Sequence, residues 1–165
     1  MNETDRKHLA RAVDLAEAGM ALDNDPFGSV LVSAEGEVLF EGHNHTASGD
    51  QTRHPEFDIA RWAAEHLTPE QRAGATVYTS GEHCPMCAAA HGWVGLGRIV
   101  FAGSIGQLTA WLAEVGAPPS PVRPLSITDV LSDARVEGPD LSFASRLREL
   151  HQRRAAALGY GVRTA

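Results

Sequence analysis

The stretch that decides the fold is ATVYTSGEHCPMCAAAHGWVGLGRIVF, residues 75–101. Its first five residues form a compact run rich in β-branched side chains, which predicts a central strand. A polar loop over 80–84 follows, and Pro85 suits the first turn of a helix that we expect to continue to about Val94. Residues 98–101 predict the next strand. A strand, a helix and a strand in this order indicate two parallel strands joined by a helical crossover.

The same alternation continues on both sides of this unit. Upstream, the sequence predicts a helix, a hairpin of two strands and a helix, at 4–22, 28–32, 38–40 and 54–66. Downstream, it predicts a helix, a strand after a proline-rich loop and a final amphipathic helix, at 105–115, 125–130 and 141–158. Because single strands alternate with helices, we expect an α/β fold: a three-layer α/β/α sandwich around a mixed five-stranded sheet, in one domain over 1–165.

Composition limits the classes of function. The chain carries 14 Lys and Arg against 21 Asp and Glu, a net charge of −7, which disfavours binding to nucleic acid. No apolar run approaches the roughly 18–20 residues that a membrane span needs. Residues 1–10 are polar and lack the apolar core of a signal peptide. Two cysteines form no disulfide framework. We therefore expect a cytoplasmic domain that acts on a small molecule and binds no membrane.

Two short motifs together predict a metal site. Cys84 and Cys87 form a C-x-x-C, and His54 lies thirty residues upstream. One histidine and two cysteines suit Zn²⁺, and three protein ligands leave a fourth position for water, which is the catalytic pattern. Zinc lowers the pKa of such a water toward about 7. Glu56, two residues after the histidine, can take the proton of that water without being a ligand. A closed structural zinc site or a redox pair is the alternative.

H-x-E followed by C-x-x-C is the signature of the zinc-dependent cytidine, nucleobase and tRNA-adenosine deaminases, and the chain resembles this family over roughly residues 9–101. It is most similar to the guanine deaminase and nucleobase deaminase branch. The matching stretches lie at 26–28, 41–44, 54–56 and 78–87, with Trp93 after them. The resemblance implies a cytidine deaminase-like fold. It also implies that His54, Cys84 and Cys87 bind zinc and that Glu56 shuttles protons.

The resemblance further implies which residues bind the substrate. Asn44 is expected to contact the base, Phe27 and Trp93 to stack on it, and Glu82 to hydrogen-bond it. The alternatives are a local backbone hydrogen bond for Asn44, core packing for Phe27 and Trp93, and a helix-start charge for Glu82. His83 stands where the family signature has proline, and this departure leaves the identity of the substrate open.

The C-terminal segment has its own implied role. In enzymes similar to guanine deaminase this segment helps to close the pocket, often across a dimer. We therefore expect residues 141–165 to form a helix and tail that close the active site, with Tyr160 or Phe143 reaching it. The resemblance also implies a homodimer.

Taken together, the motifs predict a zinc-dependent hydrolase that deaminates a free nucleobase or a related aminated heterocycle and releases ammonia. The substrate would be of the guanine or isoguanine, cytosine, or s-triazine type. A nucleoside or nucleotide deaminase is the main alternative. Deamination of tRNA adenosine is disfavoured by the net charge of −7. An inactive zinc-stabilised module would have no need of a carboxylate at Glu56.

Overall fold

A mixed five-stranded sheet forms the middle of the protein in the computed structural model, which describes residues 1–161. The strands are β1 (Gly28–Val32), β2 (Val38–His43), β3 (Thr76–Gly81), β4 (Arg98–Gly103) and β5 (Val136–Glu137), in the order β2-β1-β3-β4-β5. β1 is antiparallel to both of its neighbours, whereas β3, β4 and β5 are parallel. The predicted mixed sheet and α/β class are confirmed.

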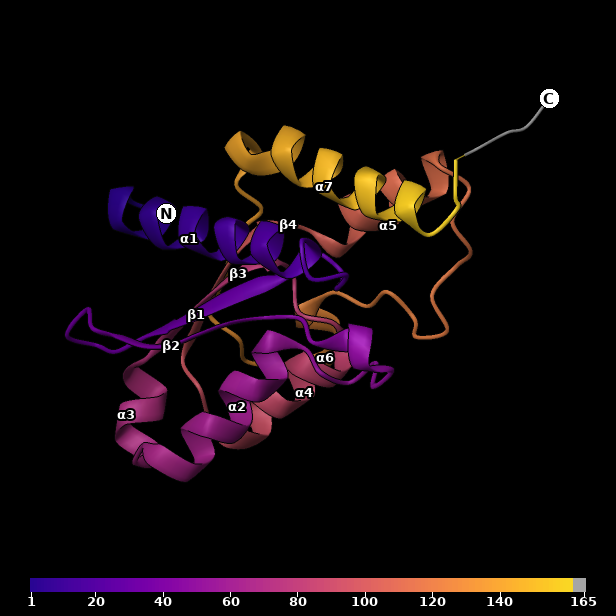
Figure 1. Ribbon diagram of the computed structural model, residues 1–165. Coiled ribbons are helices and arrows are strands. Elements are labelled where there is room, and N and C mark those ends of the chain that lie inside the picture. Colours follow the sequence, from indigo (N-terminus) through magenta and orange to yellow (C-terminus); the bar gives the residue numbers. More distant parts are fainter. Residues whose placement is uncertain (162–165) are drawn as a thin grey trace.

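Helices cover both faces of this sheet (Figure 1). One face carries α1 (Glu3–Met20), α5 (Ile105–Glu114) and α7 (Ala144–Ala157). The other carries α2 (Pro55–His66), α3 (Pro69–Gly74), α4 (Pro85–Val94) and α6 (Ile127–Val130). Within the described residues no helix is both long enough and apolar enough to cross a bilayer.

The core consists of separate layers on the two faces of the sheet. Every residue of β1 is buried, as expected of a strand that is covered on both sides. Because side chains alternate along a strand, Val30 packs in the cluster that contains Leu9 of α1, whereas Leu31 packs in the cluster that contains Ile59 of α2. The first two helices therefore pack on opposite faces of the same strand.

The predicted strand over 125–130 is wrong. These residues instead lead into the short helix α6, and the last strand is β5, farther along the chain. The Ser126 side chain accepts a hydrogen bond from the backbone N–H of Asp129, and the Asp129 carboxylate accepts one from the N–H of Ser126. This reciprocal capping box begins a helix in spite of the β-branched residues that follow Ser126. The final helix is also preceded by a 3₁₀ turn, Leu141–Phe143.

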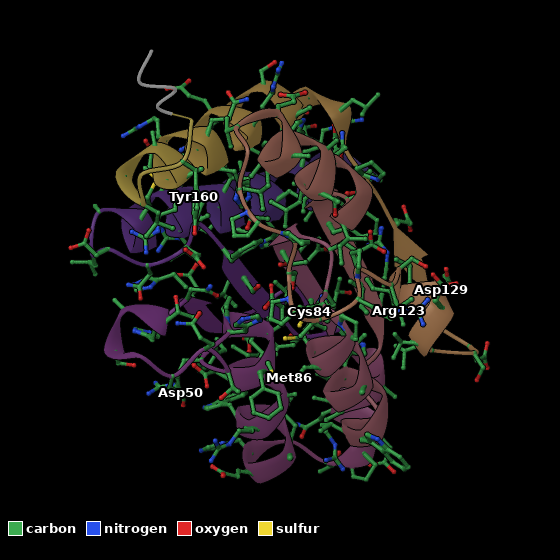
Figure 2. All side chains as sticks on the ribbon, turned by 90° about the vertical axis from the view of Figure 1, so that its right-hand side faces the viewer. Asp50, Cys84, Met86, Arg123, Asp129 and Tyr160 are labelled. Atoms are coloured by element: carbon green, nitrogen blue, oxygen red, sulfur yellow. The ribbon has the colours of Figure 1, made fainter. Side chains whose placement is uncertain are left out.

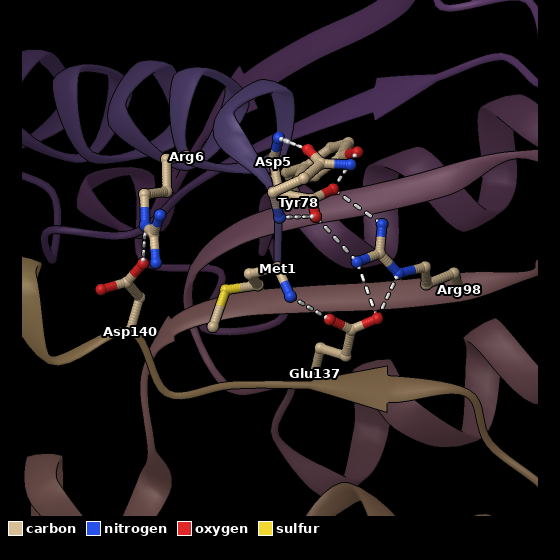
Figure 3. A network of polar contacts seen from close by, with 8 residues as sticks. Met1, Asp5, Arg6, Tyr78, Arg98, Glu137 and Asp140 are labelled. Carbon is tan, nitrogen blue, oxygen red and sulfur yellow. Dashed lines mark hydrogen bonds and ion pairs between the residues drawn. The ribbon is translucent and has the colours of Figure 1, made fainter.

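A polar network ties together the end of the sheet at which the parallel strands begin (Figure 3). Arg98, the first residue of β4, pairs with both carboxylate oxygens of Asp5 at 2.7 and 3.0 Å and with Glu137 of β5. The hydroxyl of Tyr78 donates to Asp5 at 2.9 Å. Asp5 is only 2% exposed, and its hydrogen bond to the Arg98 guanidinium holds the pKa of its carboxyl well below the usual range. The other end of these strands carries the residues described next.

Candidate metal centre and active site

Two helix starts bring the predicted metal ligands together. His54 is the N-cap residue of α2, Cys84 is the N-cap residue of α4, and Cys87 lies in the first turn of α4. A proline follows each N-cap residue, which fixes the backbone for the first helical turn. α2 and α4 pack against each other, so the starts of both helices lie side by side next to the carboxyl end of β3.

The three ligand atoms form a nearly regular triangle. Cys84 Sγ lies 3.5 Å from Cys87 Sγ, and His54 Nδ1 lies 3.7 and 3.6 Å from the two sulfurs. A tetrahedral zinc with bonds of about 2.3 Å to sulfur and about 2.0 Å to nitrogen would separate its ligands by roughly 3.5–3.8 Å. The donor set and its spacing therefore fit zinc, and these are the three side chains that can hold it.

The charge state of the sulfurs agrees with a cation site. The pKa of Cys84 is lowered to about 4, first because it hydrogen-bonds to Cys87 and then because it contacts His54. The same sulfur–sulfur hydrogen bond, together with burial, raises the pKa of Cys87. The shared hydrogen bond thus favours the thiolate at Cys84 and the thiol at Cys87. A divalent cation favours the thiolate at both positions, so metal binding is expected to release protons.

The two carboxylate oxygens of Glu56 have different surroundings. The residue lies in the first turn of α2 and is 6% exposed. Oε1 accepts a hydrogen bond from Thr79 Oγ1 at 2.7 Å and lies 3.1 Å from Ser29 Oγ. Oε2 lies 3.8 Å from Cys87 Sγ, on the side of the metal ligands. Burial raises the pKa of this carboxyl above its ordinary value. One oxygen is therefore held by the sheet, and the other faces the candidate metal centre.

Sequence analysis did not identify Ser29 and Thr79. They face each other across β1 and β3, their hydroxyl oxygens are 2.9 Å apart, and both residues are completely buried. A hydroxyl inside an otherwise apolar strand was the available signal, since a buried polar side chain needs a partner. The partner could not be named without the pairing of the two strands.

A cavity of about 420 Å³ opens beside the ligands. Phe27, His54 and Cys84 line its inner side, so the structure brings the predicted Phe27 to the site. The backbone at Gly81 passes close to the Phe27 ring, and a Cβ there would lie 3.0 Å from it. Because glycine has no Cβ, the Phe27 ring can pack directly against the backbone at this position.

Asn44 does not line this cavity, but its backbone contacts Phe27, which does. Its N–H donates to the carbonyl of Phe27 at 3.0 Å, and the residue is 1% exposed. The side-chain Oδ1 is buried without a hydrogen-bond partner among the described residues. A buried amide oxygen left in this way is costly unless a ligand donates to it. The alternative interpretation of Asn44 was a hydrogen bond between its side chain and the nearby backbone. Its side-chain oxygen makes no such bond among the described residues.

The Glu82 carboxylate contacts the starts of two helices. One carboxylate oxygen accepts from the N–H of Ile105, the first residue of α5, and the other accepts from the N–H of Ile127, the first residue of α6; both distances are 3.0 Å. The side chain therefore joins the starts of two helices. The structure places the Glu82 charge at the starts of α5 and α6, and the expected hydrogen bond to the substrate stays a prediction.

Neither Trp93 nor Tyr160 lines the cavity. Trp93 lies near the end of α4, is 90% exposed and borders a different hollow next to Leu131. Tyr160 follows α7 and lies well away from Cys84 in Figure 2. Phe143, the other residue considered for closing the pocket, packs against the core on the α1 side. Within one chain the described residues do not bring Trp93 or Tyr160 to this cavity, and their roles in binding the substrate stay predictions. The end of the predicted tail, 162–165, lies outside the described residues.

Comparisons with known proteins agree with the geometry of the site. The family described as the cytidine and deoxycytidylate deaminase zinc-binding region matches residues 2–103. A guanine deaminase of Bacillus subtilis (strain 168) is 42% identical over 87 residues, which are 52% of this chain and 55% of that protein. A tRNA-specific adenosine deaminase of Haemophilus influenzae is 33% identical over 104 residues, 62% of this chain and 60% of that protein. The chain thus spans little more than half the length of these relatives.

A solved structure extends the likeness to most of the chain. The X-ray structure of guanine deaminase from Bacillus subtilis superimposes with a TM-score of 0.57 at 28% sequence identity. The superposition covers 90% of this chain and 95% of that one. The similarity in fold therefore continues beyond the matched zinc-binding region.

Proposed function

The chain belongs to the cytidine and deoxycytidylate deaminase family, whose matching region is zinc-binding, and we propose that it removes the exocyclic amine of a free nucleobase or a related aminated heterocycle by hydrolysis. The observation that carries this proposal is the position of Glu56. One carboxylate oxygen is held by Thr79 and Ser29, and the other faces the three metal-binding side chains. Such a carboxylate is positioned to move protons between water and substrate.

His54, Cys84 and Cys87 would hold the zinc ion, which lowers the pKa of a water molecule toward about 7. Glu56 Oε2 would take a proton from the attacking water and pass it to a ring nitrogen of the substrate as the hydroxyl adds to the ring carbon. Glu56 would then carry the proton of that hydroxyl to the amine; the carbon–nitrogen bond breaks, ammonia leaves, and the ring carbon becomes a carbonyl. The carboxyl must hold a proton between these steps, and the raised pKa that burial gives Glu56 supports this. The overall reaction consumes one water molecule and releases one ammonia molecule.

Two features support a small heterocycle as the substrate. Asn44 offers a buried amide oxygen without a described partner, which suits an N–H on a ring edge. The ring of Phe27 lines the cavity beside His54 and can stack on a planar base. The net charge of −7 disfavours an RNA substrate, although tRNA-specific deaminases are among the relatives. The guanine deaminase relative is consistent with a purine base.

The test is ammonia release by the zinc-loaded protein. The panel holds guanine, isoguanine, cytosine, 5-azacytosine, adenine, ammeline, the corresponding nucleosides and a tRNA. We expect turnover of free bases and not of nucleosides or tRNA. Glu56→Gln should keep zinc and lose at least about 10²-fold in rate. Glu65→Gln, on the exposed side of the same helix, is the matched control. Turnover of tRNA or nucleosides alone would contradict the proposal.

A further inference from the structure

The cavity beside the metal ligands has two unlike walls. Its inner wall carries Phe27, His54 and Cys84, the site already described. Its outer wall is one face of α5 together with the proline-rich loop that follows it. On this outer wall lie Ile105, Leu108, Leu112, Val122 and Arg123. Figure 2 shows Arg123 on the same side of the molecule as Cys84.

The outer wall offers apolar surface that the described residues leave partly exposed. α5 contains no fully buried residue, and Ile105, Leu108 and Leu112 are all half-buried. Val122 is 50% exposed. Burial of apolar surface is favourable roughly in proportion to its area, so an apolar group that entered this cavity would gain affinity from these side chains.

The hydroxyls of the outer wall are engaged locally. Thr109 donates its hydroxyl proton to the carbonyl of Ile105 at 2.8 Å. Ser120 Oγ accepts from the backbone N–H of Val122 at 3.1 Å. Among the described lining residues Arg123 alone carries a fixed charge, and it is exposed. A sugar placed against this wall would lose hydrogen bonds to water and regain few.

The size of the cavity also exceeds what a bare base requires. Cavities of about 300–1,000 Å³ typically hold drug-sized ligands, and this one measures about 420 Å³. A single nucleobase is smaller than such ligands. A base held between the metal ligands and Phe27 would leave the side facing α5 and Val122 unfilled.

We propose that the outer wall binds an apolar substituent of the substrate. The preferred substrate is then an aminated heterocycle with an alkyl or aryl arm, and a ribose on the same ring atom is disfavoured. This inference rests on the proposed deaminase function. It adds a class of substituent that the motifs of the metal centre do not specify.

The experiment compares different substituents on the same heterocyclic ring. The zinc-loaded Glu56→Gln protein, which binds without turnover, is titrated by calorimetry with the parent base that the panel identifies. In the guanine series the other probes are 9-butylguanine, guanosine and guanosine monophosphate; in the cytosine series they are 1-butylcytosine, cytidine and cytidine monophosphate. Each buried methylene is worth about fourfold in affinity. We expect the butyl compound to bind at least about tenfold more tightly than the parent base, and the nucleoside more weakly.

Matched variants locate the effect. Val122 lies on an exposed loop, so Val122→Ser should not impair folding. This variant should reduce the preference in affinity for the butyl compound severalfold and leave the affinity for the parent base unchanged. Leu112→Asn should act in the same direction, whereas Ala110→Asn, on the part of α5 outside the cavity lining, should have no effect. Arg123→Gln should leave the butyl preference intact.

The outcomes separate the two proposals. Suppose that the wild-type protein turns over the parent base and the Glu56→Gln protein binds the butyl compound and the parent base equally tightly. This result overturns only the present inference. Tighter binding of the nucleoside monophosphate that depends on Arg123 also overturns it, in favour of an anionic arm. If the wild-type protein turns over no compound of the panel, the proposed function fails, and this inference fails with it.

Discussion

Glu56 depends on two neighbours that come from strands rather than from its own helix. Thr79 Oγ1 lies 2.7 Å from the carboxylate and Ser29 Oγ lies 3.1 Å from it. Both hydroxyls are fully buried, so they cannot be replaced by bulk water when they are removed. At the scale of single residues, the activity of Glu56 should therefore depend on these positioning residues.

Thr79→Val tests this dependence with almost no change in side-chain volume. A hydrogen bond to a charged group is worth about 1.5–3 kcal/mol, so kcat should fall about tenfold or more as Glu56 loses its fixed orientation. KM should change little, since Thr79 does not line the cavity. Thr79→Ser restores the hydroxyl and should recover most of kcat. An unchanged kcat in Thr79→Val, measured by ammonia release, would refute the positioning role.

At the scale of elements, Glu82 links three segments that surround the site. It lies between β3 and Cys84, its own N–H donates to the carbonyl of Gly103, and its carboxylate accepts from the first residues of α5 and α6. Helix N-termini carry unpaired N–H groups and favour a negative charge. The charge thus holds the outer wall of the cavity in place relative to the metal-binding loop.

Glu82→Gln removes the charge and leaves one amide oxygen for two N–H donors. The unsatisfied donor should cost about 1–3 kcal/mol in the free energy of unfolding, measured by urea denaturation. Glu35→Gln, a change in the exposed turn between β1 and β2, serves as the control and should leave the urea midpoint unchanged. Equal midpoints for the wild type and Glu82→Gln would show that the two hydrogen bonds do not stabilise the fold.

The packing of α7 introduces a pH dependence. His151 is 6% exposed, with its ring next to Phe27 and Trp111. Burial lowers its pKa from 6.5 to about 4. As the pH falls from 6.5 toward 4, the unfolded chain binds a proton at this residue and the folded chain does not. This stabilisation is therefore present above about pH 6.5 and is lost progressively below it, by up to about 3 kcal/mol.

Urea denaturation at pH 7.5 and at pH 5 measures this effect. The wild type should lose stability between the two values, and His151→Phe, which keeps an apolar ring and does not titrate, should lose less. The difference between the two proteins isolates His151 from other histidines with lowered pKa values, such as His8 and His45. Identical losses in both proteins would exclude His151 as the cause.

At the scale of the whole molecule, one end of the sheet carries the metal ligands and the other end carries a stabilising polar network. The metal ligands gather beside the carboxyl end of β3, whereas the network around Asp5 and Arg98 closes the other end and joins α1 to β4 and β5 (Figure 3). Asp5 is almost completely buried. A buried charge that loses its partner is strongly destabilising.

Arg98→Gln leaves the Asp5 carboxylate without its main partner. The free energy of unfolding should fall by about 3 kcal/mol or more, and the double variant Asp5→Asn/Arg98→Gln should recover part of that loss, because no buried charge remains. Arg11→Gln, which breaks an exposed pair with Glu41, should cost less than about 1 kcal/mol. Equal effects of Arg98→Gln and Arg11→Gln in urea denaturation would contradict a structural role for the network.

The pattern of the sequence determined most of the elements and the three metal ligands. Helical periodicity and the run of β-branched residues are local properties, so they indicated α1, α2 and α4 and the strands β1 to β4 near their observed bounds. The segment before Asp129 was assigned wrongly because a capping box outweighed strand propensity. The ligands could be predicted because the spacing of Cys84 and Cys87 places both sulfurs on one helical turn.

Tertiary structure decided what surrounds those ligands. Ser29 and Thr79 meet Glu56 only because β1 and β3 pair in one particular register, and no local pattern specifies a register between strands that are far apart in the chain. Glu82 contacts two helix starts, and Trp93 points into solvent, because the placement of α5, α6 and the end of α4 depends on packing. Local chemistry therefore determined which atoms can bind a metal. Long-range packing determined which atoms orient the proton-transferring carboxylate and shape the cavity.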